Sequence, residues 1–333
     1  QPDADPAQLA HHYYLSSQPA RALPYLARAG ERALRVRSYA EAREFGLQAI
    51  GLMGRFPSSA QHDRAERIDL NLQLAQAYAF TGAQTKALQL LHETERVAES
   101  LGDGERLAHI FYRSSQLFWL QGEPQTADDY ARRTLRRAEE LGHRPLRFAA
   151  LRMLGRCGIT LSSYDDAIAY LLRYIELGKQ ENLADLPAIY GYLGVAYARV
   201  GSWKRALNAA QTGVADAGDI ANGAMGVVAR MQLAFVYGEL YEWENALETA
   251  VSIQDAWREE GMSPHMMMLR AVIGRAMAHA NRAAEGIAEI QAALAWADDM
   301  DYKVLIHVVR CYLAEAYYQQ GEYEKGAAVA ETA

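Results

Sequence analysis

Cysteine is scarce in this sequence, and its two copies, Cys157 and Cys311, stand far apart. There is no Cys-x-x-Cys pair and no evenly spaced set, which excludes a disulfide framework and a cysteine-ligated zinc. Both are interpreted as small buried apolar residues. The 34 Lys and Arg are outnumbered by 41 Asp and Glu, which gives a net charge of -7. Because a phosphate backbone needs a basic partner surface, we expect no direct nucleic-acid binding.

Long apolar runs are also missing. No uninterrupted apolar stretch approaches the roughly 20 residues of a membrane-spanning helix, and the first ten residues lack the basic-then-apolar pattern of a signal peptide. We therefore expect no membrane association and a cytoplasmic location. The sequence opens on Gln1 rather than Met and stops within a helical pattern, so it is interpreted as a piece of a longer protein.

The motifs of catalysis and cofactor binding are absent as well. The sequence has no Gly-x4-Gly-Lys-Ser/Thr, Gly-x-Gly-x2-Gly, His-Glu-x2-His or Gly-x-Ser-x-Gly. The pairs Asp128-Asp129 and Asp165-Asp166 are interpreted as first-turn helix residues, where negative charge suits the helix dipole. His11-His12 has no further ligand at metal-binding spacing. We expect no enzyme activity, no cofactor and no metal.

What the sequence does contain is a short turn pattern that recurs about every 40 residues. The pattern is a turn-forming residue, usually an aromatic residue or Pro two positions later, and a small residue three positions after that. The closing small residues are Ala42, Ala87, Ala127, Ala167, Ala206, Ala246, Gly286 and Gly326. Eight copies at a nearly fixed period indicate a repeat architecture.

Each repeat is predicted to form two helices joined by this turn. Seven residues before the turn most copies have a small residue, as at Gly194 and Gly274, which leaves room for a neighbouring helix. The second helices are predicted to end at residues that tolerate a left-handed backbone, namely Gly102, Gly142, Asn182 and Gly261. No segment has the alternation of a strand. We expect one all-α repeat domain over 1–333, with a junction and first repeat in 1–66 and regular repeats, the last truncated, in 67–333.

These anchors resemble the tetratricopeptide repeat, whose signature is Trp-x2-Leu-Gly-x2-Tyr followed by Ala-x3-Phe. Leu193, Gly194 and Tyr197, followed by Ala206, give the closest local match. The opening Trp and the closing Pro are missing, and the period is near 40 rather than 34. The longer form is similar to the repeat arrays of STAND signalling ATPases, such as maltose-type transcription activators and ATPase-linked nucleotide cyclases. The resemblance implies a right-handed superhelical α-solenoid of about eight helix pairs and a covalently linked ATPase or effector domain in the parent chain.

The resemblance also implies that the first helices line a concave face. Positions that point away from the packing stripe then face a groove, and they are rich in aromatic residues and Arg, which recognition surfaces favour. The candidate ligand-binding residues are Tyr112, Gln116, Trp119, Arg152, Arg156, Tyr192, Arg199, Phe235 and Arg275, accompanied by His109, Met231, His279, Glu315 and Tyr318. The alternative is that these side chains pack between repeats.

The favoured functional hypothesis is a non-catalytic sensor module that binds a protein, a peptide or a small anionic effector in this groove. The alternative is a structural scaffold that holds an assembly together and has no groove ligand. Two local clusters are interpreted as structural. The run Met266-Met267-Met268 is assigned to the core and a helix start, and the Arg cluster between 132 and 137 to a solvated helix face.

Overall fold

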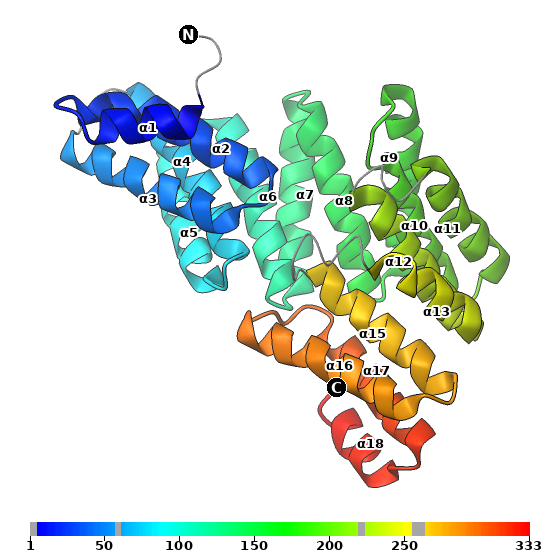
Figure 1. Cartoon of the computed structure of the whole chain (residues 1–333). Coiled ribbons are helices and arrows are strands. Elements are labelled where there is room, and N and C mark those ends of the chain that lie inside the picture. The colour runs from blue at the N-terminus through cyan, green and yellow to red at the C-terminus, as the bar shows by residue number, and fades with distance from the viewer. Residues whose placement is uncertain (1–4, 57–60, 219–223, 255–263) are drawn as a thin grey trace. The chain divides into compact units, whose positions relative to one another are not determined.

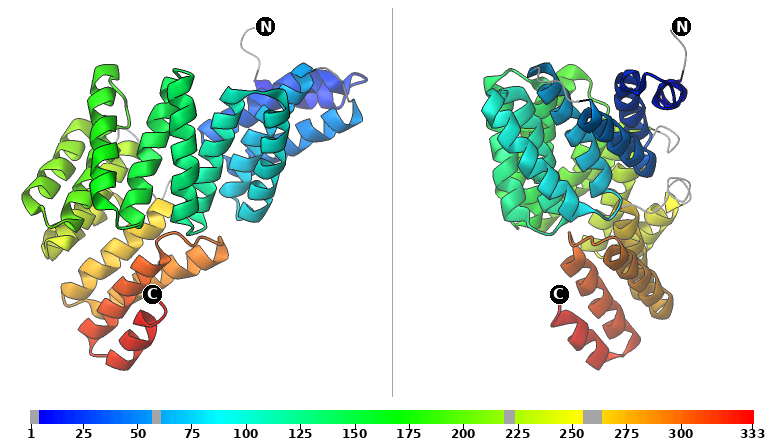
Figure 2. Two further views of the ribbon diagram at one scale, coloured as in Figure 1. Left: turned by 180° about the vertical axis from the view of Figure 1, so that it is seen from behind. Right: turned by 90° about the vertical axis from the view of Figure 1, so that its left-hand side faces the viewer.

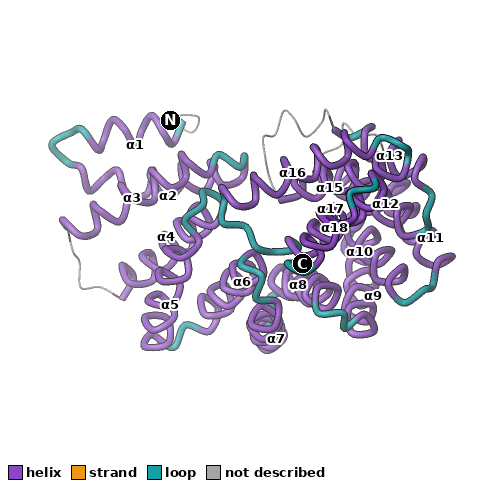
Figure 3. Tube along the Cα trace, turned by 90° about the horizontal axis from the view of Figure 1, so that it is seen from below, coloured by secondary structure: helices purple, strands orange, loops and turns teal. Residues whose placement is uncertain are grey.

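The computed structural model describes residues 5–56, 61–218, 224–254 and 264–333. Within these ranges the chain forms seventeen α-helices, one short 3₁₀ helix and no strand (Figures 1 and 3). None of the described helices is long and apolar enough to cross a bilayer. The predicted all-α class is confirmed.

Eight helix pairs follow a short leading segment, as the eight turn patterns predict. The leading segment is α1 (Pro6–Tyr14) with the 3₁₀ helix η1 (Pro19–Ala22). The pairs are α2 (Leu23–Arg35) with α3 (Tyr39–Arg55), α4 (Gln61–Ala79) with α5 (Gln84–Leu101), α6 (Gly104–Leu120) with α7 (Pro124–Glu140), α8 (Arg144–Thr160) with α9 (Tyr164–Glu181), α10 (Leu186–Arg199) with α11 (Trp203–Ala217), α12 (Ala224–Glu239) with α13 (Trp243–Val251), α15 (Pro264–His279) with α16 (Ala283–Asp299), and α17 (Ile306–Gln320) with α18 (Tyr323–Ala330).

Residue contacts group the chain into two compact units. Unit 1 consists of Gln1–Phe118 and Asp129–Arg147, and unit 2 consists of Trp119–Asp128 and Phe148–Ala333. Unit 1 thus holds α1 to α5 and most of α6 and α7, whereas unit 2 holds the α6–α7 turn, most of α8 and all later helices. A single continuous domain over 1–333 stays a prediction.

The turn inside each pair has the same backbone construction in all eight copies. Its first residue is left-handed every time, at Arg37, Gly82, Gly122, Ser162, Gly201, Tyr241, Asn281 and Gly321. In seven of these turns the next N–H donates back to a carbonyl five residues earlier, as from Ala83 to Tyr78 (3.1 Å). This is the Schellman arrangement, which satisfies carbonyls at the end of the first helix. The turn therefore sets the start of every second helix.

The small residues of the pattern lie where the two helices of a pair touch. Ala87, Ala127, Ala167 and Ala206 have no exposed surface. In the α15/α16 pair both contact residues are glycine, and a Cβ on Gly274 would lie 2.5 Å from the carbonyl oxygen of Gly286. The prediction that small residues permit close helix approach is confirmed.

The ends and starts of the second helices follow most of the residues predicted for them. Gly102, Gly142 and Asn182 are left-handed just after α5, α7 and α9, as predicted, and Gly261 lies outside the described residues. Asp165-Asp166 does lie in the first turn of α9. The expectation for Asp128-Asp129 was wrong, because α7 begins at Pro124 and puts this pair in its second turn.

Candidate functional site

Unit 2 contains a cavity of about 480 Å³ whose wall is built from the first helices of the pairs. Its lining residues come from the end of α6 and from α8, α10, α12, α15 and α17, with Ser162 from a turn, Tyr164 from the start of α9, and Val304 and Leu305 from the α16–α17 loop. The lining residues lie at fixed sequence offsets from the turn of each helix pair. The position six residues before the turn is occupied by Arg156, Val195, Phe235, Arg275 and Glu315.

Most of the residues proposed from the sequence meet at this cavity. Its lining includes six of the nine candidates, namely Trp119, Arg156, Tyr192, Arg199, Phe235 and Arg275, and also Met231 and Glu315. Arg152 is engaged elsewhere, because it bonds Asp185 at 2.6 Å, and Asp185 also accepts from the Tyr174 hydroxyl at 2.6 Å. Tyr112 and Gln116 belong to unit 1 and bond each other at 3.1 Å.

Several lining residues escaped the sequence reasoning. Met267 and Met268 form part of the wall although the Met run was assigned to the core, and Met267 is indeed fully buried. Tyr312 lies nine residues before its turn, the same offset as Tyr192, so the repeat register was a usable signal for it. The interpretation of Cys311 was wrong: it is exposed and lines the cavity, whereas Cys157 is buried as predicted.

One end of the cavity wall carries an ion-pair network. Arg275 bonds Glu239 at 2.9 Å and Glu315 at 2.8 Å. Arg199 lies 3.3 Å from Glu239, and His279 lies 2.6 Å from Glu315. Burial opposes the charge on Arg275, but Tyr312, Glu315 and Glu239 together raise its pKa above the ordinary value. Both carboxylates are thus engaged by cations of the protein itself.

Tyr312 lies against this network without joining it. Its ring centroid is 4.6 Å from the guanidinium carbon of Arg275. The Tyr312 hydroxyl is buried and has no hydrogen-bond partner among the described residues. Burial raises the pKa of this phenol, so it is protonated at neutral pH. The cavity wall therefore contains an unused hydroxyl.

A different arrangement surrounds Arg156. The guanidinium carbon lies 3.8 Å from the Trp119 ring centroid and 5.9 Å from that of Tyr192. The Trp119 indole N–H donates to the Thr160 hydroxyl (3.2 Å), which donates to the Arg156 carbonyl (3.0 Å). The Arg156 Nε is buried without a hydrogen-bond partner, and no carboxylate of the described chain lies within ion-pair distance. This cation is held in place and not neutralised.

A clasp formed by Lys303, Val304 and Leu305 closes the cavity wall within unit 2. The backbone N–H groups of Lys303 and Val304 both donate to the Leu120 carbonyl, each at 3.1 Å. This brings the loop before α17 beside the α6–α7 turn (Figure 2). Leu305 has a left-handed backbone (φ 61°), which is unusual for a branched residue. Because Val304 and Leu305 line the cavity, the clasp is part of the site.

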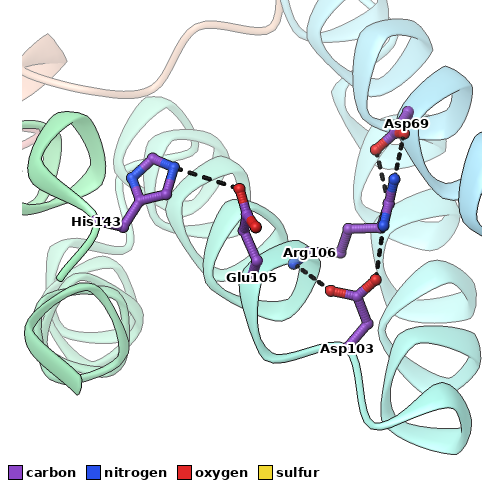
Figure 4. A network of polar contacts seen from close by, with 5 residues as sticks. All are labelled: Asp69, Asp103, Glu105, Arg106 and His143. Carbon is purple, nitrogen blue, oxygen red and sulfur yellow. Dashed lines mark hydrogen bonds and ion pairs between the residues drawn. The ribbon is translucent and has the colours of Figure 1, made fainter. Parts of the chain in front are cut away.

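Unit 1 contains a polar cluster of another kind, formed by Glu105, His109 and His143; Figure 4 shows the contact between Glu105 and His143. Ligand-type atoms of Glu105, His109 and His143 lie within 4.8 Å of one another, so we tested this group as a metal site. The Leu146 N–H donates to His143 Nδ1 at 3.2 Å, which puts the His143 proton on Nε2, the atom 3.5 Å from Glu105. A metal on Nε2 would require the opposite tautomer. The contacts therefore favour a hydrogen-bonded helix start.

No family model and no curated protein matches this sequence. Solved structures do match its fold. Rap protein complexed with competence and sporulation factor has a TM-score of 0.65 at 11% identity, covering 94% of this chain and 97% of that one. NprR in complex with its cognate peptide NprX has a TM-score of 0.64 at 12% identity, covering 93% and 88%.

A third match is a STAND protein with a tetratricopeptide-repeat sensor from Pyrococcus horikoshii. It has a TM-score of 0.52 at 15% identity and covers 98% of this chain, which spans about half (52%) of that protein. Helix pairs with tetratricopeptide-like anchors, together with these matches, define the class: the chain has the fold of tetratricopeptide-repeat α-solenoids. The longer-period form predicted from the turn spacing agrees with this fold.

Proposed function

We propose that this chain is a non-catalytic sensor module that binds a peptide, a protein segment or a small effector in the unit 2 cavity. The observation that carries the proposal is a cavity wall of first helices in which polar atoms of Arg156 and Tyr312 are buried without hydrogen-bond partners among the described residues. Buried polar groups are nearly always paired in native proteins, so unpaired ones on residues that line a cavity support a contact with another molecule.

The solved structures add support from their fold. Rap and NprR, both similar in fold, are described in complex with a competence and sporulation factor and with a cognate peptide. The lack of catalytic sequence motifs supports a binding module rather than an enzyme. In the proposal the module belongs to a larger signalling or transcription-regulating STAND ATPase, an assignment supported by the match to a sensor of that class.

A cavity-filling variant tests the binding role. Val308 lines the cavity, and Val200, 42% exposed, does not. We expect the wild-type chain to bind the neutral fluorescent probe N-phenyl-1-naphthylamine at one site, Val308→Trp to weaken this binding at least tenfold, and Val200→Trp to leave it unchanged. Fluorescence titration measures all three. Equal binding by wild type and Val308→Trp would contradict a ligand in this cavity.

The proposed parent protein has its own test. The coding sequence on the 5′ side of the Gln1 codon is expected to encode a Gly-x4-Gly-Lys-Ser/Thr loop, the phosphate-binding element of such an ATPase. Any other kind of domain there contradicts the ATPase assignment and leaves the cavity proposal intact.

One observation favours the alternative of a structural scaffold. Tyr318 and Tyr323, in the last helix pair, have ring centroids 5.2 Å apart with the rings tilted, and they are 64% and 62% exposed. Exposed aromatic pairs are typical of protein contacts. If this pair mediates assembly, Tyr318→Ser combined with Tyr323→Ser changes the mass measured by light scattering and leaves probe binding unaffected.

A further inference from the structure

The charged side chains that line the unit 2 cavity are paired at one end of its wall and not at the other. Three arginines line it: Arg156, Arg199 and Arg275. The two lining carboxylates, Glu239 and Glu315, are bonded by Arg199, Arg275 and His279 at the far end of the wall. This leaves Arg156 as the guanidinium without a carboxylate among the described residues. Among the described lining residues the surplus is therefore one positive charge, in a protein with a net charge of -7.

The surroundings of Arg156 preorganise its guanidinium group for binding an anion. One face of the guanidinium lies on the Trp119 ring. The Trp119 indole is fixed in turn by its hydrogen bond to the Thr160 hydroxyl, which donates to the backbone carbonyl of Arg156. A guanidinium presents a planar fork of donors that matches a carboxylate bidentately. In a partly dehydrated cavity such charge-assisted bonds are stronger than in water. Because the fork is held before a ligand arrives, little side-chain entropy is lost on binding.

The rest of the wall is apolar and adaptable. Met267, Met268, Val272, Val308 and Phe235 line it. Methionine side chains adjust to ligands of different shape. A volume of about 480 Å³ lies within the 300–1,000 Å³ typical of small-molecule pockets, and the Val304–Leu305 clasp limits its extent. The space therefore fits a compact molecule better than an extended protein segment.

We propose that the occupant is a compact amphiphile with one carboxylate-class anionic group, held by Arg156, and an apolar body packed on the Met267–Met268 wall. This inference rests on the proposed function, because it specifies the ligand of that same cavity. The chemistry is shared by small organic acids and by the free C-terminus of a short apolar peptide.

The test compares two probes with similar aromatic bodies, 8-anilinonaphthalene-1-sulfonate, which is anionic, and N-phenyl-1-naphthylamine, which is neutral. Arg156→Gln is expected to weaken binding of the anionic probe at least tenfold, equivalent to about 1.4 kcal/mol, with binding of the neutral probe within twofold of wild type. Arg152→Gln is the matched control, since Arg152 lies one turn earlier on α8, outside the lining, and pairs with Asp185. Thermal melts check that each variant is folded.

Each outcome decides something different. Unchanged binding of the anionic probe by Arg156→Gln overturns the assignment of the anion site, and an equal loss of both probes shows a structural role for Arg156 and overturns it too. In both cases the cavity proposal survives, because the wild type still binds. If the wild type binds neither probe, the proposed function itself fails and this inference fails with it.

A second arm separates the two sources of the carboxylate. Calorimetry compares the acetylated dipeptide Leu-Phe as its free acid with the same dipeptide as its C-terminal amide. A tenfold preference for the acid that is lost in Arg156→Gln supports a peptide C-terminus as the anion. Binding of the sulfonate probe alone supports a small organic acid. Equal binding of acid and amide, with no effect of Arg156→Gln on the sulfonate probe, overturns the anion site.

Discussion

Units 1 and 2 are built from the same helix pair and the same turn, but they treat the equivalent first-helix positions differently. Gln116 in unit 1 and Arg156 in unit 2 both lie six residues before a turn. Gln116 donates to the Tyr112 hydroxyl (3.1 Å) and accepts from Arg113 (2.9 Å), so its polar atoms are satisfied within α6. Arg156 stacks on Trp119, and its Nε has no hydrogen-bond partner in the described part of the chain. The repeat therefore determines the position of a side chain. The side chains around that position determine whether its polar atoms remain available for a ligand.

The two units also use one electrostatic device at different depths. Arg106 in unit 1 bonds Asp69 and Asp103, each at 2.7 Å (Figure 4). Arg275 in unit 2 bonds Glu239 and Glu315. The Arg106 side chain is 30% exposed and that of Arg275 is 16% exposed. Water screens the ion pairs of Arg106 more than those of Arg275. Although the distances are similar, we therefore expect the Arg275 ion pairs to contribute more to the free energy of unfolding.

The largest expected effect comes from removing these two cations. Arg275→Gln removes the cation shared by Glu239 and Glu315, and Arg275 itself is only 16% exposed, so we expect a loss of about 3 kcal/mol of unfolding free energy. Arg106→Gln is expected to cost about 1 kcal/mol, because its partners keep access to water. Urea unfolding of the full chain measures both, and hydrogen exchange assigns each loss to its unit. Equal losses of unfolding free energy in the two variants would contradict the explanation that the more buried arginine contributes more.

The helix pairs could be predicted from sequence because their determinants are local. Each turn, its small closing residue and the left-handed helix ends lie within a few residues of one another, and every copy repeats the signal. The same register predicted that residues such as Arg156 and Phe235 would share one wall, and both line the cavity. Sequence periodicity is sufficient to predict a contact when that contact recurs at a constant distance from the turn in every repeat.

The remaining parts of the site depend on contacts without a local pattern. The Leu120 carbonyl meets Lys303 and Val304, residues far away in sequence, and no motif around either segment indicates this. The exposure of Cys311 follows from its position on the cavity wall, which its small apolar character did not reveal. Among the described residues Arg156 lacks a carboxylate partner because Glu239 and Glu315 pair with Arg199, Arg275 and His279, which lie on other helices of unit 2.

A smaller effect is expected at the helix contacts. In unit 2, a Cβ on Gly274 would lie 2.5 Å from the Gly286 carbonyl oxygen and 2.6 Å from the Ile290 side chain. Gly274→Ala is therefore expected to cost about 2 kcal/mol through overpacking against backbone. Gly51 in α3 of unit 1 has open space around it, so Gly51→Ala should stabilise by about 0.5 kcal/mol. Urea midpoints measure the two signs, and destabilisation by both variants would contradict the close-contact explanation.

The clasp of unit 2 is tested by a matched pair of turn glycines. Gly122 (φ 76°) and Gly82 (φ 72°) have the same left-handed backbone, but a Cβ on Gly122 would lie 3.3 Å from Lys303, whereas Gly82 has open space. Each change to Ala costs about 1 kcal/mol for the backbone. Gly122→Ala should cost about 1 kcal/mol more and lower the exchange protection of the Lys303 and Val304 amides. If the Lys303 and Val304 amides exchange at the same rate in both variants, the clasp moves away from residue 122 without losing its hydrogen bonds.

The smallest effect concerns pH and belongs to unit 1. Burial, His143 and Arg113 lower the pKa of His109, while Glu105 and Asp69 act in the opposite direction. The unfolded chain therefore binds a proton more readily than the folded one. The contribution of His109 to stability is present above its unfolded pKa, near 6.5, and is lost as the pH falls below it.

His109→Gln should therefore reduce the fall in unfolding free energy between pH 7 and pH 5. The difference in slope cannot exceed that of one proton, about 1.4 kcal/mol per pH unit, and is expected to be a fraction of it. His92→Gln, at an exposed position of α5 in the same unit, is the control and should follow the wild-type slope. Urea unfolding across this pH range makes the measurement. A wild-type slope for His109→Gln would mean that the burial of His109 on α6 does not contribute to the acid sensitivity of unit 1.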